Sequence, residues 1–407
     1  MSPVVTIRLV LTVLLGAAVA GQAPPGHPEL GAKSVSSQTS PSGNGRKTVG
    51  PGGYVGDDKC RSCHSDMVET FHQTAHYLTS RLPSADSIHG KFTPGENLLQ
   101  TSNPEIFFRM DANDKGFFQT AVIGKGPHTT LHTERFDLVI GSGRKGQTYL
   151  FWKGDQLFEL PVSYWAFAGH WTDSPGYRDG FINFNRLVLP RCLECHATYF
   201  ESLSPPGNRY NHSNYVLGIS CETCHGGGRE HITRRSAKSE PESGQAIVNP
   251  ARLSRDRQMD LCALCHAGAG IQLNRAFTYT PGEPLDKYLE LPSADPDPQI
   301  DVHGNQVELL KKSRCFQSSA MTCLTCHDVH LPQRDLAAFS QRCIACHKVE
   351  SCGLYPKAGR QIAGNCIDCH MPNDESRLVV VSGSDGGQAK LRVRNHWIKV
   401  YPILPAR

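Results

Sequence analysis

The same five-residue spacing occurs seven times along the chain: two cysteines three positions apart, followed at once by a histidine. Cysteines at this spacing reach the two vinyl groups of one porphyrin as thioethers, and the histidine then lies beneath the iron as its axial ligand. We number the sites 1 to 7 in chain order. They are Cys60/Cys63/His64, Cys192/Cys195/His196, Cys221/Cys224/His225, Cys262/Cys265/His266, Cys323/Cys326/His327, Cys343/Cys346/His347 and Cys366/Cys369/His370.

Two other kinds of site also use paired cysteines. Zinc sites do not require histidine at one fixed offset every time, and a thioredoxin-like centre needs one pair beside a βαβ unit. Histidine is 19 of 407 residues, so its appearance after all seven pairs by chance has a probability on the order of one in a billion. The spacing therefore predicts seven covalently attached c-type haems. Cys315 and Cys352 remain outside the sites, and either a disulfide or two free thiols would suit them.

Two further histidines follow haem sites at short distances. His330 lies three residues after His327, and such a spacer reaches only about 10 Å when fully extended. It is too short to pass around the rim of its own haem, so we expect His330 to bind the iron of a neighbouring haem. His231 follows His225 by six residues across three glycines, and the same argument applies.

A plausible helix over residues 66–76 would place His72 and His76 four apart on one face. One or both could reach iron, or they could be surface or capping residues. The histidines outside the seven sites, leaving aside His27 in the N-terminal linker, outnumber the haems, so complete bis-histidine ligation is possible. Bis-histidine iron suits electron transfer, whereas a haem lacking its sixth ligand can bind a small molecule.

The N-terminus predicts export. Arg8 precedes an apolar run from Leu9 to Ala20 that ends in a small-residue cleavage site, which predicts a signal peptide over residues 1–20. The alternative is a membrane anchor, for which the run is short. No later segment is long enough to span a membrane, and residues 21–53 read as a disordered Pro/Gly/Ser linker. We expect a periplasmic or other extracytoplasmic location in a bacterium.

Net charge says little about partners once haem is considered. The formal charge is +4, but two propionates per haem would take a seven-haem protein to about −3. Nucleic acid is therefore not expected as a partner. We expect redox proteins instead: other cytochromes, or a quinol-linked or terminal oxidoreductase.

The chain divides into four further segments: a first haem-binding segment at 54–90, a cysteine-free insert at 91–190, a multihaem core with six sites at 191–371, and a tail at 372–407. Apolar residues make up only 39% of the chain, so we expect a fold that is mainly α with much irregular loop, wrapped around haems. The insert predicts a small antiparallel β-rich region, giving α+β overall. Its expected strands are 106–109, 117–122, 136–140, 147–152 and 157–162.

Several stretches carry a resemblance to a known family. They are Phe71–His76, Ile219–Gly226 with His231, Met321–His330, Cys366–Pro372 and Asn395–Ile398. In these stretches the chain resembles multihaem c-type cytochromes of the cytochrome c-552/c-554 (doubled CXXCH) group, related to the hydroxylamine oxidoreductase and multihaem nitrite reductase superfamily. The resemblance implies distal ligands, most strongly His76, His231, His330 and His396, then His303, and more weakly His89 and His212. It leaves His128, His132 and His170 as bystanders.

Two departures limit what the resemblance implies about catalysis. No C-x-x-C-K site occurs here, although nitrite reductases of this kinship usually have one. Hydroxylamine oxidoreductase is an eight-haem enzyme, whereas this chain has only seven sites. We therefore expect a heptahaem electron carrier with closely stacked, mostly bis-histidine haems. The alternatives are an oxidoreductase with one open haem acting on a small nitrogen or sulfur compound, and a haem-rich module docked through its β insert.

Overall fold

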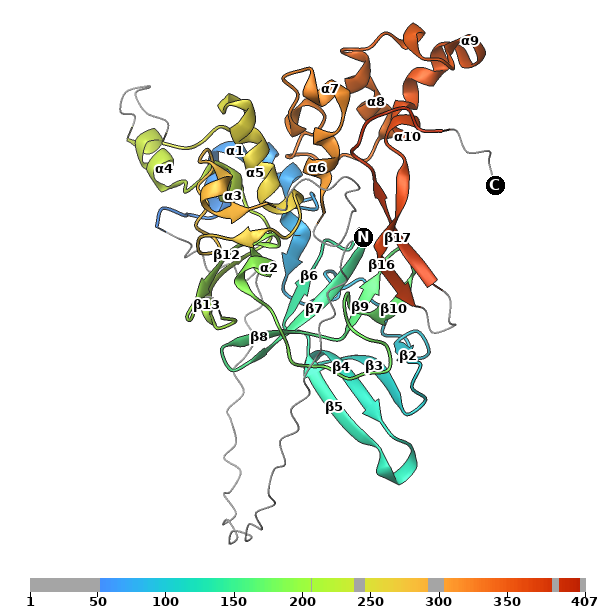
Figure 1. Cartoon of the computed structure of the whole chain (residues 1–407). Helices are drawn as coiled ribbons and strands as arrows, with labels where there is room; N and C mark the ends of the chain where they lie inside the picture. Colours follow the sequence, from blue (N-terminus) through green and yellow to red (C-terminus); the bar gives the residue numbers. More distant parts are fainter. Residues whose placement is uncertain (1–51, 206, 238–245, 292–303, 383–387, 403–407) are drawn as a thin grey trace, which may run out of the picture. The chain divides into compact units, whose positions relative to one another are not determined.

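The computed structural model describes residues 52–402 apart from gaps at 206, 238–245, 292–303 and 383–387 (Figure 1). The predicted signal peptide, nearly all of the predicted linker and His303 lie outside the described residues. Within the described part, no helix has both the length and the apolar character needed to cross a membrane.

The prediction of a mainly α fold is wrong. Among the described residues, helices account for 30% and strands for 27%, and the strands form five sheets. Two physical causes explain the error. Four of the seven haem sites lie on helical segments that are only three to five residues long, and strand pairs form outside the insert as well. These segments are α2 (Pro190–Glu194), α3 (Cys221–His225), η5 (Cys323–Thr325) and α10 (Cys366–His370). The strands outside the insert are β1 (Ser80–Arg81), β12 (Ala197–Ser202), β13 (Tyr210–Leu217), β14 (Ile271–Gln272), β15 (Leu289–Glu290), β16 (Asn373–Ser382) and β17 (Gln388–Arg394).

Strands are present at the positions predicted inside the insert, except that the predicted strand 157–162 is divided into two, β8 (Gln156–Glu159) and β9 (Val162–Trp165). The strands of the insert belong to two antiparallel sheets. The four-stranded sheet has the order β2 (Leu98–Gln100), β3 (Ile106–Asn113), β4 (Gly116–Ile123), β5 (Thr130–Arg135). The seven-stranded sheet contains β1 (Ser80–Arg81), β6 (Leu138–Ile140), β7 (Gly146–Lys153), β8 (Gln156–Glu159), β9 (Val162–Trp165), β10 (His170–Asp173) and β11 (Arg186–Leu187). The register pairs Lys153 with Gln156 across the turn between β7 and β8, where Gly154 has φ +60°.

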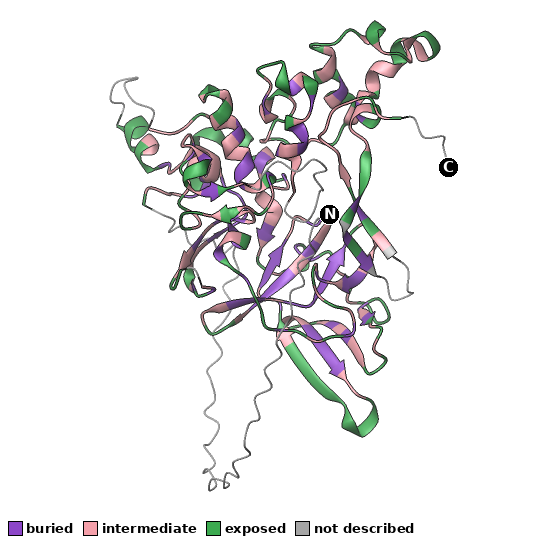
Figure 2. Cartoon of the chain, viewed as in Figure 1, coloured by how far each residue is buried: buried purple, intermediate pink, exposed green. Residues whose placement is uncertain are grey.

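Aromatic side chains join these two sheets. Phe108 and Met110 of β3 pack with Tyr149 and Phe151 of β7 and with Trp171 of β10, and all five are almost fully buried. Alternate residues of a strand point to one face, so one face of each sheet enters this core. Figure 2 shows buried residues along β4, β6, β7 and β9. This core is complete without any cofactor, and it gives the neighbouring haem sites a rigid wall.

The helices are short and carry most of the haem sites. The α-helices are α1 (Asp57–Phe71), α2 (Pro190–Glu194), α3 (Cys221–His225), α4 (Arg229–Ser236), α5 (Arg255–His266), α6 (Gln306–Lys311), α7 (Arg314–Gln317), α8 (Leu336–Ile344), α9 (Tyr355–Ala358) and α10 (Cys366–His370). The 3₁₀ turns are η1 (Tyr77–Thr79), η2 (Gly126–His128), η3 (Pro250–Arg252), η4 (Leu285–Lys287), η5 (Cys323–Thr325), η6 (Val349–Ser351) and η7 (Gly359–Gly364). The helix expected to reach residue 76 ends at Phe71, so His72 and His76 do not share a helix face.

Candidate functional site

One large cavity dominates the described part of the chain. Its volume is about 3800 Å³, and its lining includes every cysteine and histidine of the seven sites. Pockets for a single small molecule are usually about 300–1,000 Å³. The cavity is therefore large enough for several cofactors side by side, and all the predicted attachment residues face the same space.

Local helical geometry explains how each pair of thiols comes to face that space. In α3, Cys221 and Cys224 are three residues apart and so lie on one side of a helical turn, with His225 next in the chain. Gly226 then ends the helix with φ +76°. The same five-residue helix recurs in α10, and the last turn of α5 carries site 4 in the same way. One helical turn is thus the repeating unit that presents a haem site.

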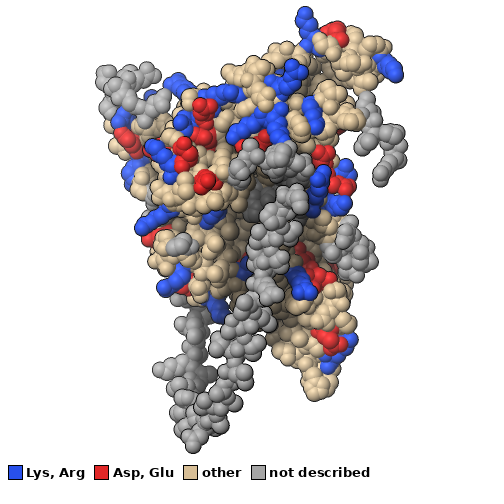
Figure 3. Space-filling view, viewed as in Figure 1, with Lys and Arg blue, Asp and Glu red and all other residues tan. Residues whose placement is uncertain are grey.

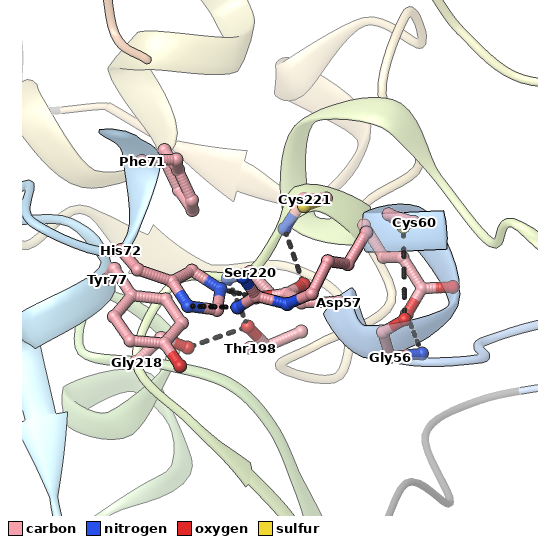
Figure 4. A network of polar contacts seen from close by, with 12 residues as sticks. Gly56, Asp57, Cys60, Phe71, His72, Tyr77, Thr198, Gly218, Ser220 and Cys221 are labelled. Carbon is pink, nitrogen blue, oxygen red and sulfur yellow. Dashed lines mark hydrogen bonds and ion pairs between the residues drawn. The ribbon is translucent and has the colours of Figure 1, made fainter. Parts of the chain in front are cut away.

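Sites distant in sequence are brought together in pairs, and Figure 4 shows the first pair. The buried carboxylate of Asp57 accepts a hydrogen bond from the Cys221 backbone N–H at 3.2 Å. The thiols of Cys60 and Cys221 are close enough to interact, which lowers the pKa of Cys60. Sites 1 and 3 are therefore in direct contact.

A second pair joins sites 2 and 4. Arg191 donates from Nη1 to Glu194 Oε2 at 2.9 Å and from Nη2 to the carbonyl oxygen of Leu264 at 2.6 Å. The thiols of Cys195 and Cys265 are close enough to interact, which raises the pKa of Cys265. The half-buried arginine therefore holds α2 of site 2 against α5 of site 4.

Two more contacts extend this arrangement. Thr322, next to site 5, donates to Gln258 Oε1 of α5 at 2.9 Å. The thiols of Cys262 and Cys323 are close enough to interact, which raises the pKa of Cys262. In the C-terminal part, the Cys366 backbone N–H donates to the hydroxyl of Ser340 in α8 at 3.1 Å. Site 5 therefore contacts site 4, and site 7 contacts the helix of site 6.

Three pairs of histidines face each other across the cavity. The ring centroids of His76 and His266 are 6.0 Å apart, those of His225 and His330 are 6.1 Å apart, and those of His327 and His396 are 6.3 Å apart. Each pair joins one site histidine to one of the histidines outside the sites. Their sequence separations show that no local pattern could have revealed these pairs.

Burial and hydrogen bonding prepare several of these imidazoles to bind a metal ion. Burial lowers the pKa of His76 and of His396 to about 4, so both are neutral at pH 7. The Nδ1 atoms of His225, His370 and His396 lie 2.8, 2.9 and 3.1 Å from backbone carbonyl oxygens. A carbonyl only accepts, so Nδ1 carries the proton and Nε2 keeps its lone pair, the arrangement found in metal-binding histidines.

The remaining histidines separate into two groups. His231 and His89 line the cavity, and burial lowers the pKa of His231, with the charges of Arg235 and His64 adding to the shift. His231 therefore lies near the histidine of site 1. The described histidines outside that lining are His72, His128, His132, His170 and His212.

His72 has a different role from the one open to it in sequence. Its Nε2 lies 3.1 Å from Asp57 Oδ2, its Nδ1 lies 3.3 Å from Arg61 Nη2, and its ring stacks on Tyr77 at 3.7 Å (Figure 4). Both ring nitrogens are occupied by these contacts. His72 positions the carboxylate between sites 1 and 3.

The cavity also contains residues that sequence reasoning missed, and their chemistry fits haem. Arg81, Trp165 and Ser220 line it and have buried side-chain polar atoms that meet no hydrogen-bond partner among the described residues. Lysines and arginines far outnumber aspartates and glutamates in the lining, which suits propionate groups. On the face shown in Figure 3, by contrast, the two signs are interspersed. Cys315 and Cys352 are free thiols that also line the cavity.

Comparison with known proteins agrees with this chemistry. Residues 181–226 match the family described as cytochrome c554 and c-prime. The chain is 22% identical over 397 residues to the dissimilatory sulfite reductase MccA of Wolinella succinogenes, across 79% of this chain and 51% of that protein. The chain is a multihaem c-type cytochrome. It binds haem c covalently, and it spans about half the length of the curated relative that it matches.

Two solved structures are also similar to this cytochrome. The outer cell wall cytochrome OcwA aligns with a TM-score of 0.52 and 16% identity, over 85% of this chain and 79% of that chain. This likeness concerns the fold alone. An undecahaem cytochrome from the S-layer of Carboxydothermus ferrireducens aligns with a TM-score of 0.35 and 15% identity, over 85% of this chain and 58% of that chain.

Proposed function

We propose that this cytochrome carries seven haems, one at each site, and transfers electrons along them through mostly bis-histidine iron. The separation of the three histidine pairs is the observation that carries the proposal. Metal–imidazole bonds of about 2.0–2.1 Å place the ring centroids of two imidazoles on opposite sides of one metal ion about 6.3 Å apart. The observed separations of 6.0, 6.1 and 6.3 Å match that value.

These separations support specific axial ligands. We assign His76 to the haem of site 4, His330 to that of site 3 and His396 to that of site 5. The proximity of His231 to His64 supports a fourth pair at site 1. His303 stays a predicted distal ligand outside the described residues. Haem iron held by two imidazoles supplies one-electron transfer without a vacant coordination position.

The contacts between sites support an order for the haems. Sites 1 and 3, sites 2 and 4, and sites 4 and 5 meet through their thiols, and sites 6 and 7 meet through Ser340. The Cys224 and Cys262 thiols interact electrostatically, as do those of Cys326 and Cys346. We infer a line 1–3–4–5–6–7 in which site 2 joins at site 4.

We propose that the protein works outside the cytoplasm with redox proteins as partners. The predicted signal peptide supports this location, as does the attachment of c-type haem outside the bacterial cytoplasm. Other cytochromes, or a quinol-linked or terminal oxidoreductase, are the expected partners. OcwA is named as an outer cell wall cytochrome, which accords with an extracytoplasmic role.

The haem count can be tested by mass. Intact-mass measurement of the purified protein is expected to show seven haems, and the double variant Cys323→Ala with Cys326→Ala is expected to show six, because each site holds its haem through two thioethers. A matched double variant, Cys315→Ala with Cys352→Ala, is expected to keep all seven. Loss of haem from this control, or a count other than seven in the unaltered protein, would contradict the assignment.

The different roles assigned to His72 and His76 give a second test. His76→Ala is expected to turn the haem of site 4 high-spin, because His76 faces His266. His72→Ala is the matched control, since both of its ring nitrogens bond to protein groups, and it is expected to leave every haem low-spin. EPR and visible spectra distinguish these outcomes. A high-spin signal in the His72 variant would show that the two roles have been exchanged.

A second candidate function is supported by one observation. MccA, the relative with 22% identity, is named as a sulfite reductase, so an oxidoreductase acting on a small sulfur or nitrogen compound is the competing proposal. Such an enzyme needs one haem with an open position. Addition of CO or nitrite to the reduced protein tests this, and an unchanged spectrum with both would leave the electron carrier as the function.

A further inference from the structure

The cavity wall formed by the β sheets contains an arginine whose charge is not matched there. Arg81 of β1 lines the cavity, and its Nε and Nη2 atoms are buried without a hydrogen-bond partner among the described residues. Burial lowers the pKa of its guanidinium, yet this group stays charged in proteins. A positive charge whose buried donors are unmatched is unfavourable, and an anionic group bound in the cavity would balance it.

Neighbouring contacts place Arg81 beside haem site 2. The hydroxyl of Thr79 lies 2.9 Å from Nδ1 of His196, and the hydroxyl of Ser80 donates to the His196 backbone carbonyl oxygen at 2.7 Å. Arg81 is the next residue of the same strand, and β1 pairs with β6 in a fixed register. The backbone of Arg81 is therefore held within a few ångströms of the segment that carries the site 2 histidine.

The wall around Arg81 is built rigidly. Buried Gln147 accepts hydrogen bonds from the His89 backbone N–H at 2.8 Å and from the Tyr149 hydroxyl at 3.3 Å. The imidazole of His89 packs on Gly143, where a Cβ atom would lie 2.2 Å from the ring. Tyr149 is near enough to Arg81 to influence the pKa of its guanidinium, while burial raises the pKa of the Tyr149 hydroxyl and keeps it neutral. Arg81 and His89 thus line the cavity on a wall connected through Gln147 and Tyr149.

We propose that Arg81 binds an anionic oxygen group in the haem cavity beside site 2, with His89 on the same wall. Two sources share this chemistry: a propionate of the site 2 haem, and a free oxyanion of sulfur or nitrogen. The planar guanidinium presents paired N–H donors that match two oxygens of either group, a geometry that lysine does not offer. The inference rests on the proposed haem loading.

Three variants test the proposal in the haem-loaded protein. Arg81→Gln removes the charge, Arg81→Lys keeps it without the paired donors, and Arg109→Gln is the control. Arg109 is a half-exposed arginine of β3 that pairs with Asp111 and does not line the cavity. Intact mass is measured first. If the seven-haem proposal is wrong, the unaltered protein shows a haem count other than seven, and this result does not depend on Arg81.

Potentiometric titration and anion titration then distinguish the two sources. If Arg81 binds a propionate, Arg81→Gln shifts one haem to lower potential, because loss of a nearby positive charge favours the oxidised iron, and added sulfite changes nothing. If it binds a free oxyanion, sulfite or nitrite perturbs the spectrum of the unaltered protein, and Arg81→Gln weakens that binding at least tenfold, with Arg81→Lys between them. Arg109→Gln behaves like the unaltered protein in both cases. Potentials and anion titrations that are the same for Arg81→Gln as for Arg109→Gln would overturn the proposal.

Discussion

Replacing His330 with alanine is expected to convert the haem of site 3 from low-spin to high-spin, and no other haem. His330 belongs to the segment that follows site 5, but its ring faces His225 of site 3 at a centroid separation of 6.1 Å. The histidine of site 5 faces His396 instead, at 6.3 Å. Loss of the His330 imidazole should therefore open the sixth position of one iron atom and leave the attachment of its haem intact.

EPR of the oxidised protein and CO binding to the reduced protein measure this change. One seventh of the iron should become high-spin in a seven-haem protein, and the same fraction should bind CO. His132→Ala is the matched control, since His132 lies on the exposed strand β5, stacks on Phe184 and stays outside the cavity lining. Retention of low-spin iron at every site in the His330 variant, or loss of haem from site 5, would contradict the ligand assignment.

The sequence predicts that His330 binds iron, but it does not predict which iron. A three-residue spacer is too short to pass around a haem, so a neighbouring haem had to be the target, but its identity could not be inferred. Site 3 lies about a hundred residues earlier in the chain, and only long-range packing brings the two segments together. His89 and His212 show the same limit. Both were weak candidates in sequence, whereas the structure places His89 in the cavity lining and stacks His212 on Trp152 at 3.9 Å.

The fold was only partly predictable from the sequence. The strands of the insert were recognisable because alternating apolar residues and glycine turns mark them, and they are present. The helix content was overestimated because a C-x-x-C-H site needs only one helical turn, as in α3 and α10. The hairpin of β16 and β17 was missed as a hairpin, since its register shifts between Glu375 and Val380 break the simple alternation. A bound cofactor replaces the apolar pattern that would otherwise mark a core.

Replacing Glu222 with alanine is expected to destabilise the protein by about 2–4 kcal/mol, because it leaves buried backbone donors without acceptors. Glu222 lies inside site 3, between Cys221 and Thr223, and is 2% exposed. Its Oε1 accepts from the backbone N–H groups of Val55 and Gly228 at 2.8 and 2.9 Å, and its Oε2 accepts from Gly56 at 2.9 Å. This single carboxylate therefore ties the start of α1, which carries site 1, to the helix of site 3.

Urea unfolding of the haem-loaded protein, followed by far-UV circular dichroism, measures the loss. Glu222→Gln should fall between alanine and the unaltered protein, because its amide keeps one acceptor oxygen but presents N–H donors to a backbone donor. Glu230→Ala is the control: this nearby glutamate is 61% exposed and pairs only with Arg234 among the described residues, so its loss should change stability by less than about 1 kcal/mol. Equal unfolding midpoints for the Glu222 and Glu230 alanine variants would show that water replaces the carboxylate. A lower unfolding midpoint for the Glu222 variant than for the Glu230 variant would show that protein hydrogen bonds hold sites 1 and 3 together, in addition to their haems.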